Sequence, residues 1–310
     1  MTAMATKAES TRVALVIFLL LVAPWVVPTS WLLVLENALV LALFAAATNL
    51  LVGWTGLVSF GQAAFYGIGA YTVALAWLHG IAPFWLAFIA APLIAGLVAF
   101  VTGAIALRAR KLYFALLTLA FSELFNVLAE QLYDITNGAN GIFGAMVPDL
   151  LVIPRPGFYF TLAVVIAALT LLYRIAHSPF GLALRAIRER RVRAEALGLA
   201  VSLHELAAFT ISGAFCGLAG ALYVVHDQTA YPELLNWVKS GEPVIVAVIG
   251  GISSFAGPLW GALFYQIAHD TLVALTRDWQ MALGALLLLV VLFRPGGIVS
   301  FFGGREHRSK

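Results

Sequence analysis

Long apolar runs that are almost free of charge recur along the whole chain, and no other feature restricts its fold as strongly. Residues 38–47 and 285–293, for example, contain only apolar side chains. Of all 310 residues, 62% are apolar and 11% are charged, whereas about a quarter of the residues in a soluble protein are charged. One soluble core cannot bury that many apolar side chains. The runs therefore indicate a protein that is surrounded by lipid.

The apolar runs predict helices rather than strands. Strands of a membrane barrel alternate apolar and polar residues over about ten positions, whereas these runs are continuous. A helix needs about 20 residues to cross a bilayer, so a chain of this length has room for about ten crossings with short loops. We predict an all-α fold, a polytopic transmembrane helix bundle of about ten spans. The predicted spans are residues 13–28, 31–52, 60–79, 83–107, 112–133, 158–175, 205–226, 240–252, 258–276 and 279–293.

The distribution of basic residues predicts the orientation of the bundle. Lysine and arginine accumulate in the cytoplasmic loops of membrane proteins. With the N-terminus inside, 15 of the 18 basic residues fall on the inner side, and Arg155, Lys239 and Arg277 fall outside. An even number of spans returns the C-terminus to the same side, where the basic segment after Arg294 agrees. We therefore expect both termini to be cytoplasmic.

The chain is expected to form one membrane domain with short tails. The tails are residues 1–12 and the basic residues 294–310, and the transmembrane domain is 13–293. The first span is interpreted as a retained helix rather than a cleaved signal peptide, because no small-x-small cleavage site follows it. Residues 177–204 form a long inner loop within the domain.

The first region that interrupts the lipid-soluble pattern is residues 53–71, where five glycines cluster at a helix entry. Glycine adopts positive φ readily, so the segment is compatible with a broken helix that lines a substrate path. Small residues also let helices pack closely, and without a family comparison this packing is the favoured interpretation. The amides of Asn49 and Gln62 favour the broken helix slightly, because polar groups near a break need partners or water.

The second region is the predicted helix 112–133, in which Glu123, Asn126 and Glu130 share one face. A carboxylate at mid-depth in a bilayer costs at least ~2.5 kcal/mol. Glu123 is therefore expected to face the protein interior or a wet cavity. It is our best candidate for a polar pathway or a subunit contact, and a simple hydrogen bond between helices is the alternative. Glu130 lies near the outer end, where water can solvate it.

The third region is the inner loop 177–204, which carries five arginines between Arg185 and Arg193. Ser178 followed by proline is a helix-start signal, and Gly198 is a stop signal. We predict a short amphipathic helix beneath the membrane. It serves either to bind anionic lipid head groups or as a handle for a cytoplasmic motor, and the residues alone do not separate the two.

Several sequence blocks occur together in one order over most of the chain, and their joint order carries a resemblance. The blocks are NLLVGWTGLVSFGQAAFYGIGAYT, LYFALLTLAFSELF, TNGANGI, SPFGLALRAIRERRVRAEALGL, SGEPVIVAVIGGISSFAGPLWGA and LFRPGGI. The chain resembles the membrane permease subunit of ATP-binding-cassette importers of the branched-chain amino-acid class, specifically the larger-loop partner of the permease pair. The resemblance extends from about residue 31 to residue 299.

The resemblance implies a function, a location and a set of partners. It implies a path for branched-chain or related amino acids in a bacterial inner (cytoplasmic) membrane, formed with a paralogous permease subunit. The expected partners also include two ATPase subunits, a solute-binding protein outside and membrane lipid, but no nucleic acid. The residues expected to couple to the ATPase are Arg185, Arg188, Arg191, Glu195, Ala196 and Gly198. The candidate path residues are Gly56, Ser59, Gly61, Gln62, Glu123, Asn126, Gly250 and Gly251.

One block departs from the family pattern, which usually has the form Gly-Gly-x-Gly-Thr-x-x-Gly-Pro. Here Ser253 replaces the third glycine and Ser254 replaces the threonine. Ser254 keeps the hydroxyl group. Ser253 adds a side chain where the family has none, which puts close backbone packing at that position in doubt.

Catalytic functions fit the sequence poorly, and no cofactor is expected. None of the four lysines stands in the Gly-Lys-Ser/Thr setting of a P-loop, so this chain is not expected to hydrolyse ATP. His204 and Glu205 open a zinc motif whose second histidine is replaced by Ala208, and a single cysteine, Cys216, forms neither an internal disulfide nor a metal cluster. The pairs His226–Asp227 and His269–Asp270 are interpreted as interfacial polar residues.

The alternative function is a stand-alone secondary transporter or channel driven by an ion gradient. In that case the carboxylates of Glu123, Glu242 and Asp270 are the candidate coupling sites, and the glycine breaks suit discontinuous helices. The long arginine-rich inner loop argues against this alternative.

Overall fold

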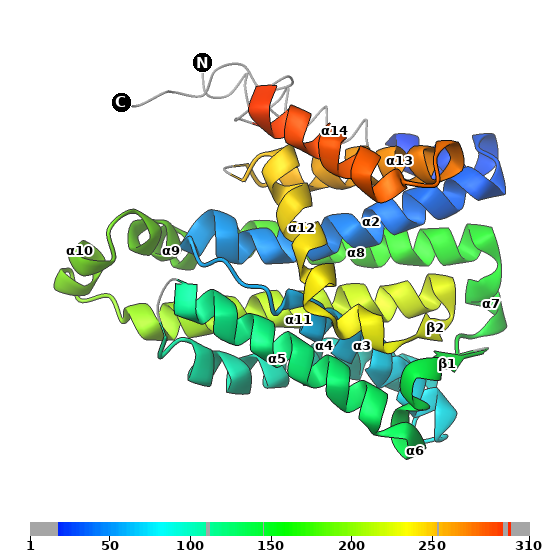
Figure 1. The fold of residues 1–310 in the computed structure, drawn as a ribbon, viewed down its shortest axis with the longest axis horizontal. Coiled ribbons are helices and arrows are strands. Elements are labelled where there is room, and N and C mark those ends of the chain that lie inside the picture. The colour runs from blue at the N-terminus through cyan, green and yellow to red at the C-terminus, as the bar shows by residue number, and fades with distance from the viewer. Residues whose placement is uncertain (1–17, 110–111, 145, 253, 294–296, 299–310) are drawn as a thin grey trace.

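The computed structural model describes residues 18–109, 112–144, 146–252, 254–293 and 297–298. In this part of the chain most helices run along one common axis, and their connections gather at its two ends (Figure 1). The predicted tails 1–12 and 294–310 lie outside the described residues, apart from residues 297–298, and so does Ser253.

Helices account for most of the described residues, and their bounds follow the apolar runs. Residues 18–26 are helical. The further helices are α2 (Thr29–Asn49), η1 (Leu50–Thr55), α3 (Gln62–Leu78), α4 (Phe84–Ala106), α5 (Leu112–Gln131), α6 (Tyr133–Thr136), η2 (Gly138–Asn140), α7 (Asp149–Val152), α8 (Pro154–Ala176), α9 (Pro179–Glu189), α10 (Arg191–Ala196), α11 (Val201–Asp227), η3 (Pro232–Leu235), α12 (Trp237–Gly250), α13 (Gly257–Leu275) and α14 (Trp279–Phe293).

Each predicted span from residue 31 onwards corresponds to a helix whose ends lie within four residues of the prediction. Among the described residues, five helical segments are long and apolar enough to cross a membrane by length and composition: 29–55, 84–106, 112–131, 154–176 and 201–227. The helix α12 has only 14 residues and α14 has 15. The polytopic helical bundle is thus confirmed, while ten crossings and the side of the termini stay predictions.

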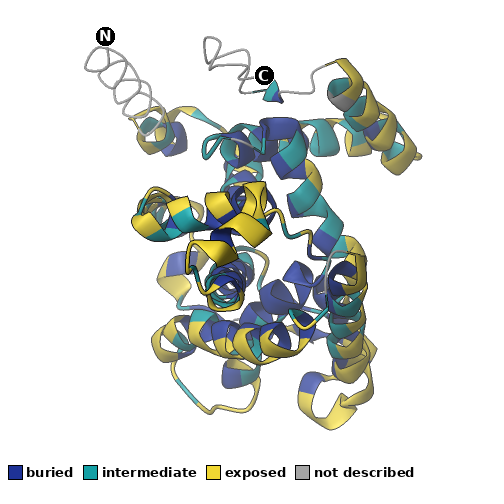
Figure 2. Ribbon diagram, turned by 90° about the vertical axis from the view of Figure 1, so that its left-hand side faces the viewer, coloured by how far each residue is buried: buried dark blue, intermediate teal, exposed yellow. Residues whose placement is uncertain are grey.

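The segments 29–55 and 201–227 form the centre of the bundle. Two thirds of their most apolar window is buried inside the protein, against one third for α4, α5 and α8. Figure 2 shows this arrangement as buried residues at the centre and exposed residues at the periphery. Leu93 and Leu97 on α4, for example, are 69% and 64% exposed. Such apolar outer faces are stable only against lipid or another apolar surface.

Glycines let α3 cross α11 at very short range. A Cβ atom added to Gly69 would lie 1.9 Å from the carbonyl oxygen of Gly217, and one added to Gly220 would lie 1.8 Å from that of Tyr66. Lipid supplies no hydrophobic drive between helices, so close backbone contact contributes much of the association. The small-residue packing considered for the segment 53–71 is therefore present in its second half.

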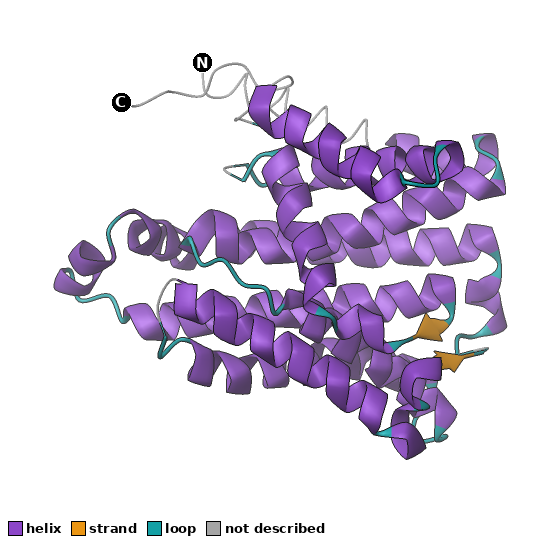
Figure 3. Cartoon of the chain, viewed as in Figure 1, coloured by secondary structure: helices purple, strands orange, loops and turns teal. Residues whose placement is uncertain are grey.

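A small antiparallel sheet interrupts the helical fold, at the end of the bundle away from α10 (Figure 3). Its strands are β1 (Ile142–Phe143) and β2 (Thr229–Ala230), with Ile142 opposite Ala230. A prediction based on apolar runs has no signal for a ladder of two residues. The strands join two loops that are far apart in the sequence, which ties the connection after α5 to the end of α11.

Candidate functional site

The helix that begins at α2 changes its winding and then stops at the first region predicted from the sequence. Residues 50–55 form the π-helix η1, which ends at Gly56 with a left-handed φ of 72°. Residues 56–61, here called the strap, are not helical and lead into α3 at Gln62. A π-turn is rare and frequently marks a functional position. The helix is therefore broken here, whereas the residues alone favoured packing of small residues in this segment.

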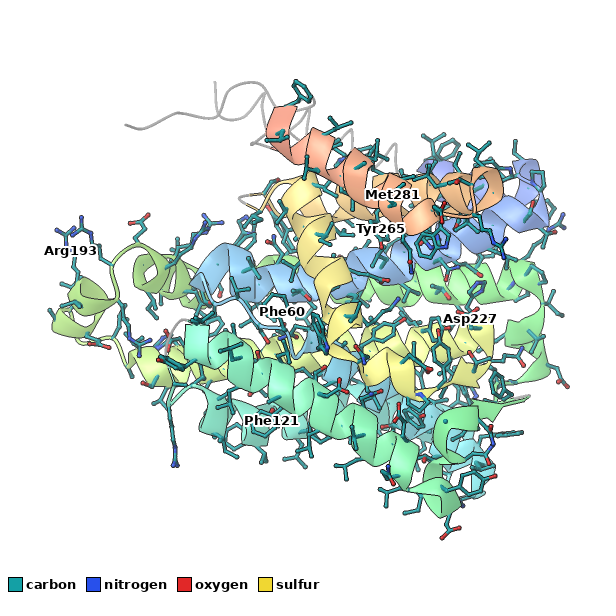
Figure 4. All side chains as sticks on the ribbon, in the orientation of Figure 1. Phe60, Phe121, Arg193, Asp227, Tyr265 and Met281 are labelled. Carbon is teal, nitrogen blue, oxygen red and sulfur yellow. The ribbon has the colours of Figure 1, made fainter. Side chains whose placement is uncertain are left out.

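Hydrogen bonds attach the strap and the start of α3 to two neighbouring helices. The backbone N–H of Phe60 donates to the Thr118 hydroxyl on α5 over 3.1 Å. The N–H of Ala63 donates to the Ser240 hydroxyl on α12 over 2.8 Å. These hydroxyls replace the helical partners that the break removes, because a buried N–H group without a partner is costly. Figure 4 shows Phe60 between α5 and α12.

Gln62 is fully buried at the start of α3 and connects the strap to α11. Its amide nitrogen donates to the Ser59 hydroxyl over 3.4 Å. Its amide oxygen accepts from the Ser212 hydroxyl and from the Cys216 thiol, each over 3.2 Å. The neighbouring Asn49 is also buried, and its side-chain oxygen has no hydrogen-bond partner within the described residues. The structure thus assembles a small polar network inside an apolar bundle.

Glu123 lies on the face of α5 that the sequence analysis singled out. Its carboxylate accepts hydrogen bonds from the amides of Asn126, over 3.5 Å, and of Asn236, over 3.4 Å. Asn126 is buried, Glu123 is half-buried and Glu130 is exposed. Among the described residues, no basic side chain forms an ion pair with Glu123. The expectation that Glu123 avoids a purely lipid environment agrees with these contacts.

The inner loop 177–204 folds into two helices instead of the single helix predicted. Arg190 is extended, with φ −150° and ψ 90°, and separates α9 from α10. Gly198 follows α10 with a φ of +84°, in agreement with the predicted stop. The two helices form a hairpin, residues 179–196, that extends beyond one end of the bundle (Figure 1). The break was not predicted because arginine is a good helix former.

The hairpin buries one apolar face and exposes another. Ile187 on α9 and Ala194 on α10 pack together with Val201. On the outer surface, Val192 is 79% and Leu197 is 76% exposed. The predicted coupling residues Glu195, Ala196 and Gly198 are also exposed. Arg193 points away from the bundle at this tip (Figure 4).

The three arginines predicted to couple to the ATPase all contact their own chain. Arg188 donates to the backbone carbonyl of Gly53 in η1. The Arg185 guanidinium lies 5.1 Å from the centre of the Trp54 ring. The third of them, Arg191, is 3.1 Å from the Glu195 carboxylate and 2.5 Å from that of Glu205, which is buried near the start of α11. These contacts attach the hairpin to the bundle.

Gly250 and Gly251 lie in a tight turn between α12 and α13, away from the polar network of Gln62. A Cβ atom on Gly250 would lie 1.8 Å from the carbonyl oxygen of Gly257. Gly251 has a φ of 115°. The same turn also contacts η1, because a Cβ atom on Gly53 would lie 2.7 Å from the carbonyl oxygen of Ile252.

Sequence reasoning missed a buried pair that joins the two central helices. The imidazole of His226, near the end of α11, lies 2.8 Å from the Glu36 carboxylate on α2, and the side chains are only 10% and 6% exposed. The interpretation of His226 as an interfacial residue beside Asp227 is corrected by this contact. Glu36 itself was the available signal, because a carboxylate within an apolar helix needs a partner.

The remaining carboxylates considered for ion coupling have separate local partners. Glu242 lies 2.7 Å from Lys239 on the same helix. Asp270 contacts Gln266 and His269, also on its own helix. No group of three potential metal ligands occurs among the described residues. These carboxylates therefore do not combine into one coordinated site.

Comparison with known proteins assigns the chain to a family. The sequence pattern of the family described as branched-chain amino acid transport system / permease component matches residues 30–292. The chain belongs to this family of permeases. The match includes η1, the strap, the hairpin and the glycine turn, so the resemblance inferred from the sequence blocks is confirmed.

Three relatives have names that agree with the family. The permease is 30% identical to the high-affinity branched-chain amino acid transport system permease protein LivM of Escherichia coli, over 81% of this chain and 65% of the relative, and the Salmonella typhimurium protein of the same name gives the same values. It is 26% identical to the probable branched-chain amino acid transport permease protein LivM of Methanocaldococcus jannaschii, over 68% of each chain. No solved structure matches the permease.

The permease therefore spans about two thirds of the length of its bacterial relatives. The family is one of transport components rather than enzymes, which agrees with the expectation that this chain carries no catalytic centre of its own. The family and the apolar helices together identify a multi-pass membrane protein.

Proposed function

We propose that this permease is the membrane subunit of an ATP-driven importer for branched-chain or related amino acids. The observation that carries the proposal is the hairpin 179–196, which extends from one end of the bundle and exposes Val192, together with the exposed Leu197 that directly follows it. Exposed apolar side chains among charged ones are typical of a protein-docking surface. The names of the LivM relatives supply the substrate class.

The hairpin is proposed to bind a cytoplasmic ATPase subunit through its exposed tip. Glu195, Ala196 and Gly198 lie on this tip, whereas Arg185, Arg188 and Arg191 hold the hairpin against the bundle. Two ATPase subunits would approach each other when they bind ATP, and the hairpins would transmit this movement to the permease pair. A helix that only binds lipid buries its apolar face in the membrane surface, whereas Val192 and Leu197 are exposed on a segment that extends beyond the end of the bundle (Figure 1).

The substrate path is proposed to run along the face formed by the strap and α5. Ser59, Gln62, Glu123 and Asn126 supply polar groups there, and Val58 in the strap is 41% exposed. A paralogous permease subunit would close this face, and a solute-binding protein would deliver substrate from outside. The proposed location is a bacterial inner membrane, with ten spans and both termini cytoplasmic.

Gly56 and Gly61 would shape the path by allowing the strap to leave the helix. Gly250 and Gly251 would support the path through the contact between their turn and η1. Gly61 has no room for a side chain, because an added Cβ would lie 2.9 Å from the carbonyl oxygen of Thr118. These glycines would therefore shape the path, and Ser59, Gln62, Glu123 and Asn126 would supply the polar contacts with substrate.

Affinity purification from gently solubilised membranes tests the proposed function. The tagged native permease should recover a second permease and ATPase subunits that carry the Gly-x-x-x-x-Gly-Lys-Ser/Thr motif. The double variant Val192→Asp/Leu197→Asp should lose the ATPases and keep the second permease. The matched control is Ile81→Asp, because Ile81 is 73% exposed on the loop before α4, at the opposite end of the bundle.

Three results would separate the proposal from its alternative. Loss of the ATPases only in the hairpin variant supports the importer. Equal recovery of the ATPases with all three proteins would remove the hairpin as their docking surface. A native permease that purifies alone, and catalyses uptake when reconstituted alone with an ion gradient, would favour the stand-alone transporter.

A further inference from the structure

The π-helix η1 is the point where the inner hairpin touches the broken helix. Arg188 on α9 donates to the carbonyl oxygen of Gly53. The Arg185 guanidinium covers the ring of Trp54, whose indole N–H donates to the carbonyl oxygen of Ala176 at the end of α8 over 3.1 Å. The Gly53 carbonyl is available to an outside donor because η1 ends at Thr55, and the last carbonyls of a helix have no partner within the helix. The hairpin therefore holds η1 through its backbone and through its largest side chain.

The opposite side of η1 rests on the glycine turn between α12 and α13. The Cα of Gly53 approaches the carbonyl oxygen of Ile252 so closely that an added Cβ would lie 2.7 Å from it. Trp54 also meets Phe255 edge to face, with ring centres 6.3 Å apart. Movement of the hairpin therefore cannot carry η1 further toward this turn, because both are already in contact.

The strap leads directly from η1 to the polar network of the proposed path. Its first residue, Gly56, has a left-handed φ of 72° and lies against Arg188: an added Cβ would be 3.0 Å from the Cγ atom of that arginine. Near its end Phe60 is attached to Thr118, and Ala63 in the first turn of α3 is attached to Ser240. Arg188 thus contacts both Gly53 within η1 and Gly56 at the start of the strap.

We propose that Arg188 is a positioning residue that transmits movement of the hairpin into η1 and the strap, instead of binding the ATPase. A π-turn holds one more residue than the α-helical turn it replaces, so a change between the two windings shifts the following segment by about one residue. Arg188 stabilises the π form through the Gly53 carbonyl. This inference rests on the proposed importer, since it needs a motor that moves the hairpin.

The first test compares ATP hydrolysis with substrate uptake in the complete complex in vesicles, with leucine as the probe. R188Q removes the charge, R188K keeps a donor, and R174Q is the matched control because Arg174 is exposed at the inner end of α8. We expect R188Q to keep its ATPase subunits and to hydrolyse ATP within about twofold of native, while uptake falls about tenfold, a typical coupling effect. R188K should recover part of the uptake, and R174Q should match native.

Two outcomes of this test would overturn the inference. If R188Q loses its ATPase subunits together with uptake, Arg188 acts in docking. If R188Q transports like native, Arg188 has no part in transmission. Failure of the proposed function is visible separately, because the native complex would then contain no ATPase.

The second test follows the strap itself and does not depend on the substrate. Spin labels at Val58→Cys and Ile81→Cys measure the distance from the strap to the opposite end of the bundle, and Cys216 is buried and stays in place. In the native complex, ATP with vanadate should change the distance distribution. The same pair in R188Q should keep the nucleotide-free distribution, and in R174Q it should change as in native. A native-like change in R188Q would contradict the inference.

Discussion

Gly56 in the segment 53–61 and the glycines Gly250 and Gly261 in the segment 250–261 serve different purposes in the same bundle. In the first segment Gly56 has a positive φ, and a side-chain hydroxyl of α5 holds the strap that follows. In the second segment backbones touch directly: a Cβ on Gly261 would lie 2.2 Å from the carbonyl oxygen of Val246. The first segment is polar and irregular, and the second is tightly packed.

This difference shows that a glycine cluster in a membrane helix has no single meaning. Gly56 is needed for its backbone dihedral angles, whereas Gly250 and Gly261 are needed because they lack a side chain. A substitution in the second segment should therefore act on the stability of the bundle. A substitution in the first should act on transport, with a smaller effect on stability.

The largest expected effect is that of Gly250→Ala. Its Cβ would lie 1.8 Å from the carbonyl oxygen of Gly257, so α12 and α13 must separate. We expect the free energy of unfolding to fall by about 3 kcal/mol or more, measured by denaturation of the purified permease in detergent with tryptophan fluorescence. Gly284→Ala on α14 is the control, because nothing lies within 4 Å of the added atom. Equal stability of the two variants would contradict the packing argument.

The next effect is that of Gln62→Leu, which tests the polar side of the comparison. The change leaves Ser59, Ser212 and Cys216 without the amide that they contact. Loss of partners for buried polar groups costs about 1–3 kcal/mol, and the same denaturation measurement should detect it. Gln266→Leu is the matched control, since Gln266 is half-buried and its side chain hydrogen-bonds only to Asp270 within the part of the chain that the structure describes. A smaller loss for Gln62→Leu than for the control would show that the network contributes little.

Gly56→Ala separates a backbone effect from a functional one. Left-handed conformation costs a residue with a Cβ about 1–2 kcal/mol, so stability should fall moderately. Gly80→Ala is the control, because Gly80 has a similar φ of +62° but no neighbour within 4 Å of the added atom. We expect similar losses of stability and a loss of leucine uptake only for Gly56→Ala. If both variants transport equally well, the strap tolerates the change, and glycine at position 56 is not required for transport.

The smallest expected effect on stability is that of Glu123→Gln. Glutamine keeps the shape of the side chain and one acceptor oxygen, so one of the two hydrogen bonds from Asn126 and Asn236 is kept and the other is lost. The free energy of unfolding should therefore fall by about 1 kcal/mol. Uptake should fall while recovery of the partner subunits stays at the native level. The matched control is Glu130→Gln on the same helix, because Glu130 is exposed. Unchanged uptake in Glu123→Gln would remove this carboxylate from the path.

The positions of the helices could be predicted from the sequence because they depend on local properties. A continuous apolar run of about 20 residues has only one way to satisfy its backbone in lipid, which is a helix. Gly198 marked the end of a helix for an equally local reason, since this residue has a positive φ. The inward orientation of the helix face that carries Glu123 could be predicted, because a carboxylate within an apolar helix needs polar partners or water.

The partners of the charged side chains were decided only by the tertiary structure. The sequence shows five arginines in one loop, but the neighbours of Arg188 and Arg185 come from η1, more than a hundred residues earlier in the chain. The pair of Glu36 and His226 likewise depends on α2 lying beside α11. Apolar runs determine which segments become helices, whereas helix packing determines which helices become neighbours. Contacts between distant residues follow from that packing, because shape and small residues select it rather than any local pattern.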